Sequence, residues 1–126
     1  MAVLLILMML LIPLIFLGIG LLWKKHPPKE INWVYGYRTC RSSASQQAWD
    51  FAHAHFAKLA LRLGMILLIA TMAAIAAALA IASYEGLETA ALCCTLAQLI
   101  ALCAPVFAVE SRLRKEFDRE GKPKES

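Results

Sequence analysis

A polar segment between two apolar stretches carries most of the side chains that could do chemistry. It reads INWVYGYRTCRSSASQQAWDFAHAH and covers residues 31–55. Within it, Arg38 stands among aromatic and amide side chains. A guanidinium in such surroundings can bind a phosphate or carboxylate through two hydrogen bonds, or stack on a ring. The competing interpretation is that Arg38 only extends toward lipid headgroups.

The same segment holds groups that resemble catalytic or metal-binding residues. A thiol and an imidazole, Cys40 and His53, could serve as nucleophile and base, but no sequence rule places them in contact. His53 and His55 lie two residues apart, and on a helix they point to nearly opposite sides, whereas zinc pairs are spaced by three or four. The serines of residues 42–45 are better explained by helix capping. We therefore predict no catalytic residue, no metal and no cofactor.

Three uncharged apolar stretches must position this segment. Of the 126 residues, 60% are hydrophobic and 17% charged, which is too much apolar surface for a soluble domain of this size to bury. The apolar residues gather in runs at roughly 2–23, 63–84 and 89–109. Each run has about the 20 residues that a helix needs to cross a bilayer. Because the backbone must satisfy its own hydrogen bonds in lipid, we predict an all-α membrane protein with three transmembrane helices.

The chain divides into six predicted parts along these runs. They are a first transmembrane helix (1–23), an aromatic and basic loop (24–43), an interfacial helix continuing into the second transmembrane helix (44–84), an external turn (85–88), a third transmembrane helix (89–110) and a basic tail (111–126). The first run has no basic residue before it, so we interpret it as a retained helix and not as a signal peptide.

The loop is predicted to be ordered at the interface. Trp33, Tyr35 and Tyr37 combine a ring with a polar tip, which favours the headgroup layer, and they alternate so that an extended backbone would place them on one side. Gly36 permits a tight bend or a close backbone approach.

The start of the second helix follows this loop. Ser43 is a candidate cap, with Gln46 returning the hydrogen bond. Beyond it, Trp49, His53, Phe56 and Ala60 are spaced by four, three and four, and therefore form one stripe on the helix.

The basic residues predict the orientation. All 13 Lys and Arg residues lie either between the first two apolar runs or after the third, and the turn at 85–88 has none. The positive-inside rule places the loop and the tail in the cytoplasm and the amino terminus outside. Since the basic clusters flank membrane ends, we expect them to contact anionic lipid headgroups, with no direct binding of nucleic acid.

Polar and small residues within the runs predict helix packing. In the second run, alanines recur every fourth residue, at Ala70, Ala74 and Ala78. Such a face allows close packing, within the chain or in a homo-oligomer. We expect Gln98 to hydrogen-bond a neighbouring helix, and Pro13 and Pro105 to kink their helices.

The loop segment resembles the SdpI family of bacterial immunity proteins. The family pattern is Asn, Gly-x-Arg-Thr, Ser or Thr, Trp, and then His or Asn, and it lies between two hydrophobic helices. This sequence matches it at Asn32, Gly36, Arg38, Thr39, Ser42, Trp49 and His53. With Tyr35 and Tyr37, these residues are the candidate binding residues. Cys40 departs from the Pro that many members have, and the chain resembles a minimal three-helix form of a longer protein.

The resemblance implies a multi-pass protein of the bacterial cytoplasmic membrane that protects the cell against a secreted, membrane-active peptide toxin. It also implies that such a protein holds a transcriptional repressor at the membrane when the toxin is present. Two alternatives stay open. One is an interfacial lipid or anion site, or a small membrane enzyme, in which Arg38 binds a headgroup and His53 is the base. The other is a structural brace without a ligand. A role without enzymatic activity is favoured.

Overall fold

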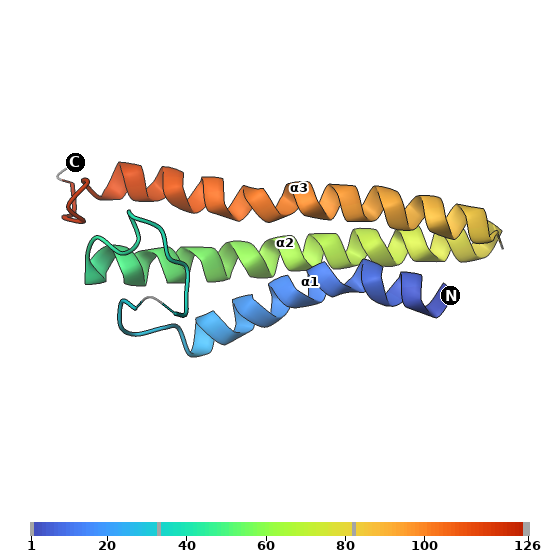
Figure 1. The fold of residues 1–126 in the computed structure, drawn as a ribbon, viewed down its shortest axis with the longest axis horizontal. Coiled ribbons are helices and arrows are strands. Elements are labelled where there is room, and N and C mark those ends of the chain that lie inside the picture. The colour runs from blue at the N-terminus through green and yellow to red at the C-terminus, as the bar shows by residue number, and fades with distance from the viewer. Residues whose placement is uncertain (1, 33, 82, 125–126) are drawn as a thin grey trace.

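The computed structural model describes residues 2–32, 34–81 and 83–124 and consists of three long helices that lie side by side (Figure 1). They are α1 (Ala2–Lys25), α2 (Gln46–Ile81) and α3 (Tyr84–Glu116). Each is long and apolar enough to cross a membrane, and large apolar side chains cover their outer faces. The predicted all-α membrane protein with three transmembrane helices is therefore confirmed.

The start of α2 differs from the prediction. The helix begins at Gln46, and its cap is Ser45, whose hydroxyl oxygen accepts a hydrogen bond from the Ala48 N–H at 3.0 Å. The predicted capping box between Ser43 and Gln46 is therefore wrong. The Gln46 side chain instead donates to the carbonyl of Lys29 at 2.5 Å, so it joins the loop to the helix.

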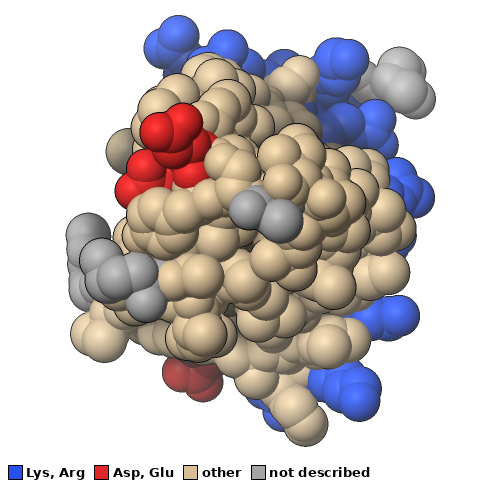
Figure 2. Space-filling model, turned by 90° about the vertical axis from the view of Figure 1, so that its right-hand side faces the viewer, with Lys and Arg blue, Asp and Glu red and all other residues tan. Residues whose placement is uncertain are grey.

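The predicted turn at 85–88 is also wrong, because these residues form the first turn of α3. The hydroxyl oxygen of Ser83 accepts from the Gly86 N–H at 3.2 Å and caps the helix there. Leu87 is buried, 3% exposed, so packing against the other helices favours the earlier helix start. Figure 2 views this end of the bundle and shows acidic residues on it, with basic residues only around its rim.

The residues after 110 are more ordered than the predicted tail. The helix continues to Glu116, and the chain then folds back, with Phe117 bridged to Pro123. The hydroxyl of Ser45 donates to the carbonyl of Gly121 at 2.5 Å. Phe117 is buried in the cluster that Tyr37 and α2 also join, so the segment 117–124 closes the start of α2.

Two glycines set how closely α1 and α2 approach. A Cβ at Gly20 would lie 2.7 Å from Leu61 Cγ and 3.0 Å from the Leu61 backbone N. A Cβ at Gly64 would lie 2.8 Å from Leu17 Cγ and 3.0 Å from the Leu17 backbone N. Each glycine thus receives a leucine of the other helix, and the backbones pack closely, as small residues allow in lipid.

The predicted alanine stripe contributes only in part to this packing. Ala78 is buried at the helix interface, whereas Ala70 is exposed. The buried small residues of α2 lie mainly nearer the loop, at Ala57, Ala60 and Gly64. The spacing of alanines in the sequence did not distinguish the buried face of α2 from its exposed face, because small residues occur on both faces.

Hydrogen bonds of one buried side chain, Gln98, connect all three helices near the middle of the bundle. Pro13 lies inside α1, which is visibly bent in Figure 1. Because proline has no N–H, the carbonyl of Met9 lacks its normal helical donor. The side-chain amide of Gln98 on α3 donates to that carbonyl at 2.9 Å and to the Thr71 hydroxyl on α2 at 3.0 Å. The prediction that Gln98 bonds a neighbouring helix is confirmed, and the physical reason is the carbonyl that Pro13 leaves unpaired.

Candidate functional site

His53 anchors the loop to α2. Its side chain is fully buried, and Nε2 accepts a hydrogen bond from the Tyr37 N–H at 2.8 Å. Nε2 therefore carries no proton, and Nδ1–H donates to the carbonyl of Trp49 at 2.8 Å. Both ring nitrogens are engaged within the chain, so His53 can act as a base only if the loop detaches.

Gly36 is required beside this histidine for two reasons. Its φ of +118° lies in a region that side chains rarely adopt. In addition, a Cβ would lie 2.8 Å from His53 Nε2 and 3.0 Å from Trp49 Cζ2. The close backbone approach predicted for Gly36 is thus found, and its partners are two other residues of the motif.

Ser42 and Thr39 bind each other's backbone. The Ser42 hydroxyl oxygen accepts from the Thr39 N–H at 2.9 Å, and the Thr39 hydroxyl oxygen accepts from the Ser42 N–H at 3.1 Å. The Ser42 hydroxyl also donates to the carbonyl of Tyr37 at 2.9 Å. Ser42 is fully buried, so its hydroxyl organises the loop and is not presented to a substrate.

Asn32 and Trp49 shape the first half of the loop. Asn32 Oδ1 accepts from the N–H groups of Val34 at 2.9 Å and Tyr35 at 2.6 Å, which is a side-chain turn. Trp49 is fully buried, and its indole N–H donates to the carbonyl of Pro28 at 2.8 Å. The proline-containing connection after α1 is therefore tied directly to α2.

The two tyrosines extend the network to the other helices. The Tyr35 hydroxyl accepts from the indole N–H of Trp23, at the end of α1, at 2.8 Å. The Tyr37 hydroxyl donates to Glu110 Oε1 on α3 at 2.8 Å. Burial, and then the Glu110 carboxylate, raise the pKa of Tyr37 above its ordinary value. Tyr37 is only 8% exposed, so its ring packs inside the protein; its predicted place at the level of the lipid headgroups stays a prediction. Trp33, the third predicted aromatic, lies outside the described residues.

Arg38 lies on the outer side of this network and is exposed. Together with Asn32, Thr39 and Cys40, it borders a hollow of about 450 Å³. Its predicted role in binding an anion stays a prediction.

The structure brings the candidate residues together at one end of the bundle, where hydrogen bonds and van der Waals contacts join them, and Arg38 lies at the outer edge of this group. The partners that sequence analysis missed are Trp23 and Glu110. Each stands where an apolar run ends, and this position was the only signal that the sequence offered.

Comparison with known proteins agrees with the motif. Residues 29–109 match the model of the SdpI/YfhL protein family. The chain is also similar to the uncharacterized protein YfhL of Bacillus subtilis (strain 168), with 46% identity over 48 residues. That match covers 38% of this chain and only 44% of the relative's length. No solved structure matches. Since the family model covers well over half of the chain, this multi-pass membrane protein belongs to the SdpI/YfhL family.

Proposed function

We propose that this protein is an immunity protein of the bacterial cytoplasmic membrane, which protects its cell against a membrane-active antimicrobial peptide. The observation that carries the proposal is the folding of the family's motif into one closed unit that ties all three helices together at a single end of the bundle. Such a unit gives the membrane domain a fixed shape, and the polar groups of His53 and Ser42 are bound within it.

The alternative of a small membrane enzyme receives less support from the same contacts. A general base needs a nitrogen or oxygen that can reach the proton it removes. The two nitrogens of His53 are both bound within the chain, and the Ser42 hydroxyl is buried and donates to a backbone carbonyl. Neither group is available as the loop stands.

In the proposed mechanism the two ends of the bundle have different tasks. The acidic end, with Glu85 and Glu88, faces outward and meets a cationic peptide together with the lipid-facing side chains. The basic end faces the cytoplasm, where the motif holds a surface that signals the presence of toxin to a cytoplasmic repressor. Arg38 is part of that surface, because it is exposed beside the buried network.

The test is a protection assay in a toxin-sensitive bacterium. Cells express the wild type, Arg38→Ala, or the control Arg41→Ala, which removes a nearby basic residue outside the motif. They then receive the secreted peptides encoded beside the gene, and the membrane potential is followed. Immunoblots of membrane fractions establish equal protein levels.

We expect the wild type and Arg41→Ala to hold the potential and Arg38→Ala to lose it. If the wild type is present in the membrane and gives no protection against any of these peptides, the immunity proposal is wrong. If protection is equal in all three, the protein is an immunity protein but Arg38 has no part in it. If Arg38→Ala lowers thermal stability as well, the loss of protection reflects a structural brace.

A further inference from the structure

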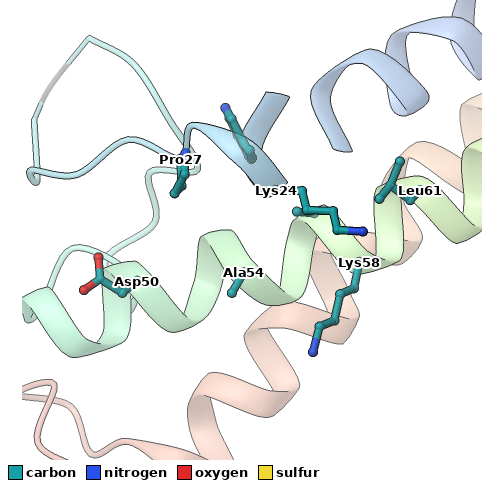
Figure 3. Close-up of a pocket in the computed structure, with 8 residues that line it drawn as sticks. Lys24, Pro27, Asp50, Ala54, Lys58 and Leu61 are labelled. Atoms are coloured by element: carbon teal, nitrogen blue, oxygen red, sulfur yellow. The ribbon is translucent and has the colours of Figure 1, made fainter. Parts of the chain in front are cut away.

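A pocket of about 350 Å³ lies between the C-terminal end of α1 and the facing side of α2 (Figure 3). None of the nine candidate residues of the motif lines it. Its walls include Trp23, Ala54 and Leu61, and three charged side chains stand around it: Lys24, Lys58 and Asp50. The pocket is therefore apolar inside and charged at its rim.

The charged groups are separated by sign. Figure 3 shows Lys24, Lys58 and Leu61 toward one end of the pocket and Asp50 at the other. Asp50 and Lys58 are two helical turns apart on α2, or about 12 Å along its axis. The end with Lys24 and Lys58 therefore carries the positive charge of the rim, and the other end carries the Asp50 carboxylate, which also accepts a hydrogen bond from the Gln46 side chain at 2.9 Å.

The position of the pocket in the bundle selects an amphiphile. Lys24 lies in the last turn of α1, where the apolar run ends, so it marks the level at which hydrocarbon meets headgroups. Leu61 lies next to Gly20, one turn farther into the apolar part. Leu21 is 51% exposed and continues the apolar surface on α1. A molecule in the pocket therefore meets lysines at headgroup level and carbon below them.

We propose that this pocket binds the headgroup of an anionic glycerophospholipid, phosphatidylglycerol. The phosphate lies at the end that Lys24 and Lys58 line, the glycerol hydroxyls face the Asp50 end, and an acyl chain runs along Leu61. Two ammonium groups and one carboxylate leave the rim with an excess positive charge, which favours a lipid with net negative charge over a zwitterionic one. This inference does not depend on the proposed immunity function.

The test is native mass spectrometry of the purified full chain in micelles that contain phosphatidylglycerol and phosphatidylethanolamine with matched acyl chains. The pocket variant is Lys24→Gln with Lys58→Gln. The control variant is Lys25→Gln with Arg62→Gln, which removes two neighbouring positive charges that do not line the pocket. Thermal unfolding in the same micelles shows whether each variant is folded.

We expect the wild type and the control to retain one phosphatidylglycerol in preference to phosphatidylethanolamine. The pocket variant should lose at least about tenfold in that affinity, because each lysine at a membrane surface contributes substantially to binding an anionic lipid. Equal losses in both double variants would show that only the overall basic charge matters and would overturn the proposal. Equal retention of the two lipids by the wild type would overturn it as well.

If the pocket variant fails to fold, Asp50→Asn provides a second test in a variant that keeps both lysines. Removing the carboxylate leaves the phosphate contacts in place and deletes the acceptor for the glycerol hydroxyls. We expect a reduced preference for phosphatidylglycerol over phosphatidic acid with the same chains. An unchanged preference would contradict the proposed placement of the headgroup.

Discussion

The Met9 carbonyl has no backbone donor, because Pro13 lacks an N–H, and the Gln98 amide donates to it instead. Replacing Gln98 by leucine removes this donor. In the native bundle, Gln98 donates to the Met9 carbonyl and to the Thr71 hydroxyl, and it is 1% exposed. Leucine fills a similar volume but leaves a buried acceptor unsatisfied, which costs about 1–3 kcal/mol. A hydrogen bond between membrane helices contributes about 0.6 kcal/mol on average and up to about 1.7. Leucine also removes Gln98 Oε1, a buried acceptor without a hydrogen-bond partner, and this relief offsets part of the cost. We therefore expect Gln98→Leu to lower the free energy of unfolding by about 1 kcal/mol.

Repeating the substitution in a Pro13→Ala background isolates the contribution of the Met9 carbonyl. Alanine restores an N–H at position 13, and that group can donate to Met9 within α1. Gln98→Leu then removes only the bond to Thr71, and the loss of the unpartnered Gln98 Oε1 offsets it, so its cost should fall to about zero. The expected coupling between the two positions is about 1 kcal/mol. As a control, Thr71→Val should cost the same in both backgrounds.

The assay compares four proteins: the wild type, Gln98→Leu, Pro13→Ala and the double variant. Each is unfolded at equilibrium in mixed micelles with increasing fractions of denaturing detergent, and the helix content is measured. An equal cost of Gln98→Leu in both backgrounds, within about 0.3 kcal/mol, would refute the view that Gln98 replaces the donor that Pro13 lacks.

Three further substitutions test the close contacts. Gly20→Ala should lower the free energy of unfolding by about 1–3 kcal/mol, because the added Cβ would meet a backbone atom of α2. The control is Gly18→Ala, whose Cβ would have no atom within 4 Å; it should change the free energy of unfolding by less than about 0.5 kcal/mol in the same assay. Gly36→Ala should destabilise the loop by about 1–3 kcal/mol from its positive φ and its contact with His53, measured as a lower thermal midpoint. His53→Leu leaves the buried Tyr37 N–H without an acceptor, so that amide should exchange its hydrogen much faster than in the wild type; unchanged exchange would show that His53 is not its acceptor.

The sequence predicted the helices well because the apolar runs have the length of a bilayer and no charge. The stripe of Trp49, His53, Phe56 and Ala60 is also confirmed: three of these side chains are fully buried, and Phe56 packs against Trp23. Stripes of this kind follow from the helical period alone.

The helix ends and the site's partners were harder to predict. Ser43 and Ser45 are equally good caps in isolation, and the choice between them depends on the segment 117–124, which binds Ser45. In the same way, the Tyr37 hydroxyl reaches Glu110 across 73 positions of the chain, a contact that exists only once α3 lies beside α2. Local pattern carries no information about which distant residue arrives at such a position.

The contact between Ser45 and Gly121 also bears on how the protein is made. Gly121 leaves the ribosome 76 residues after Ser45, which at bacterial speeds of about 5–20 residues per second is a delay of about 4–15 seconds. During that time α1 and α2 can enter the membrane and the loop can pack on His53, but the start of α2 stays open on the side that the segment 117–124 later covers. A slow stretch of codons before that segment would prolong the interval in which the start of α2 lacks this cover.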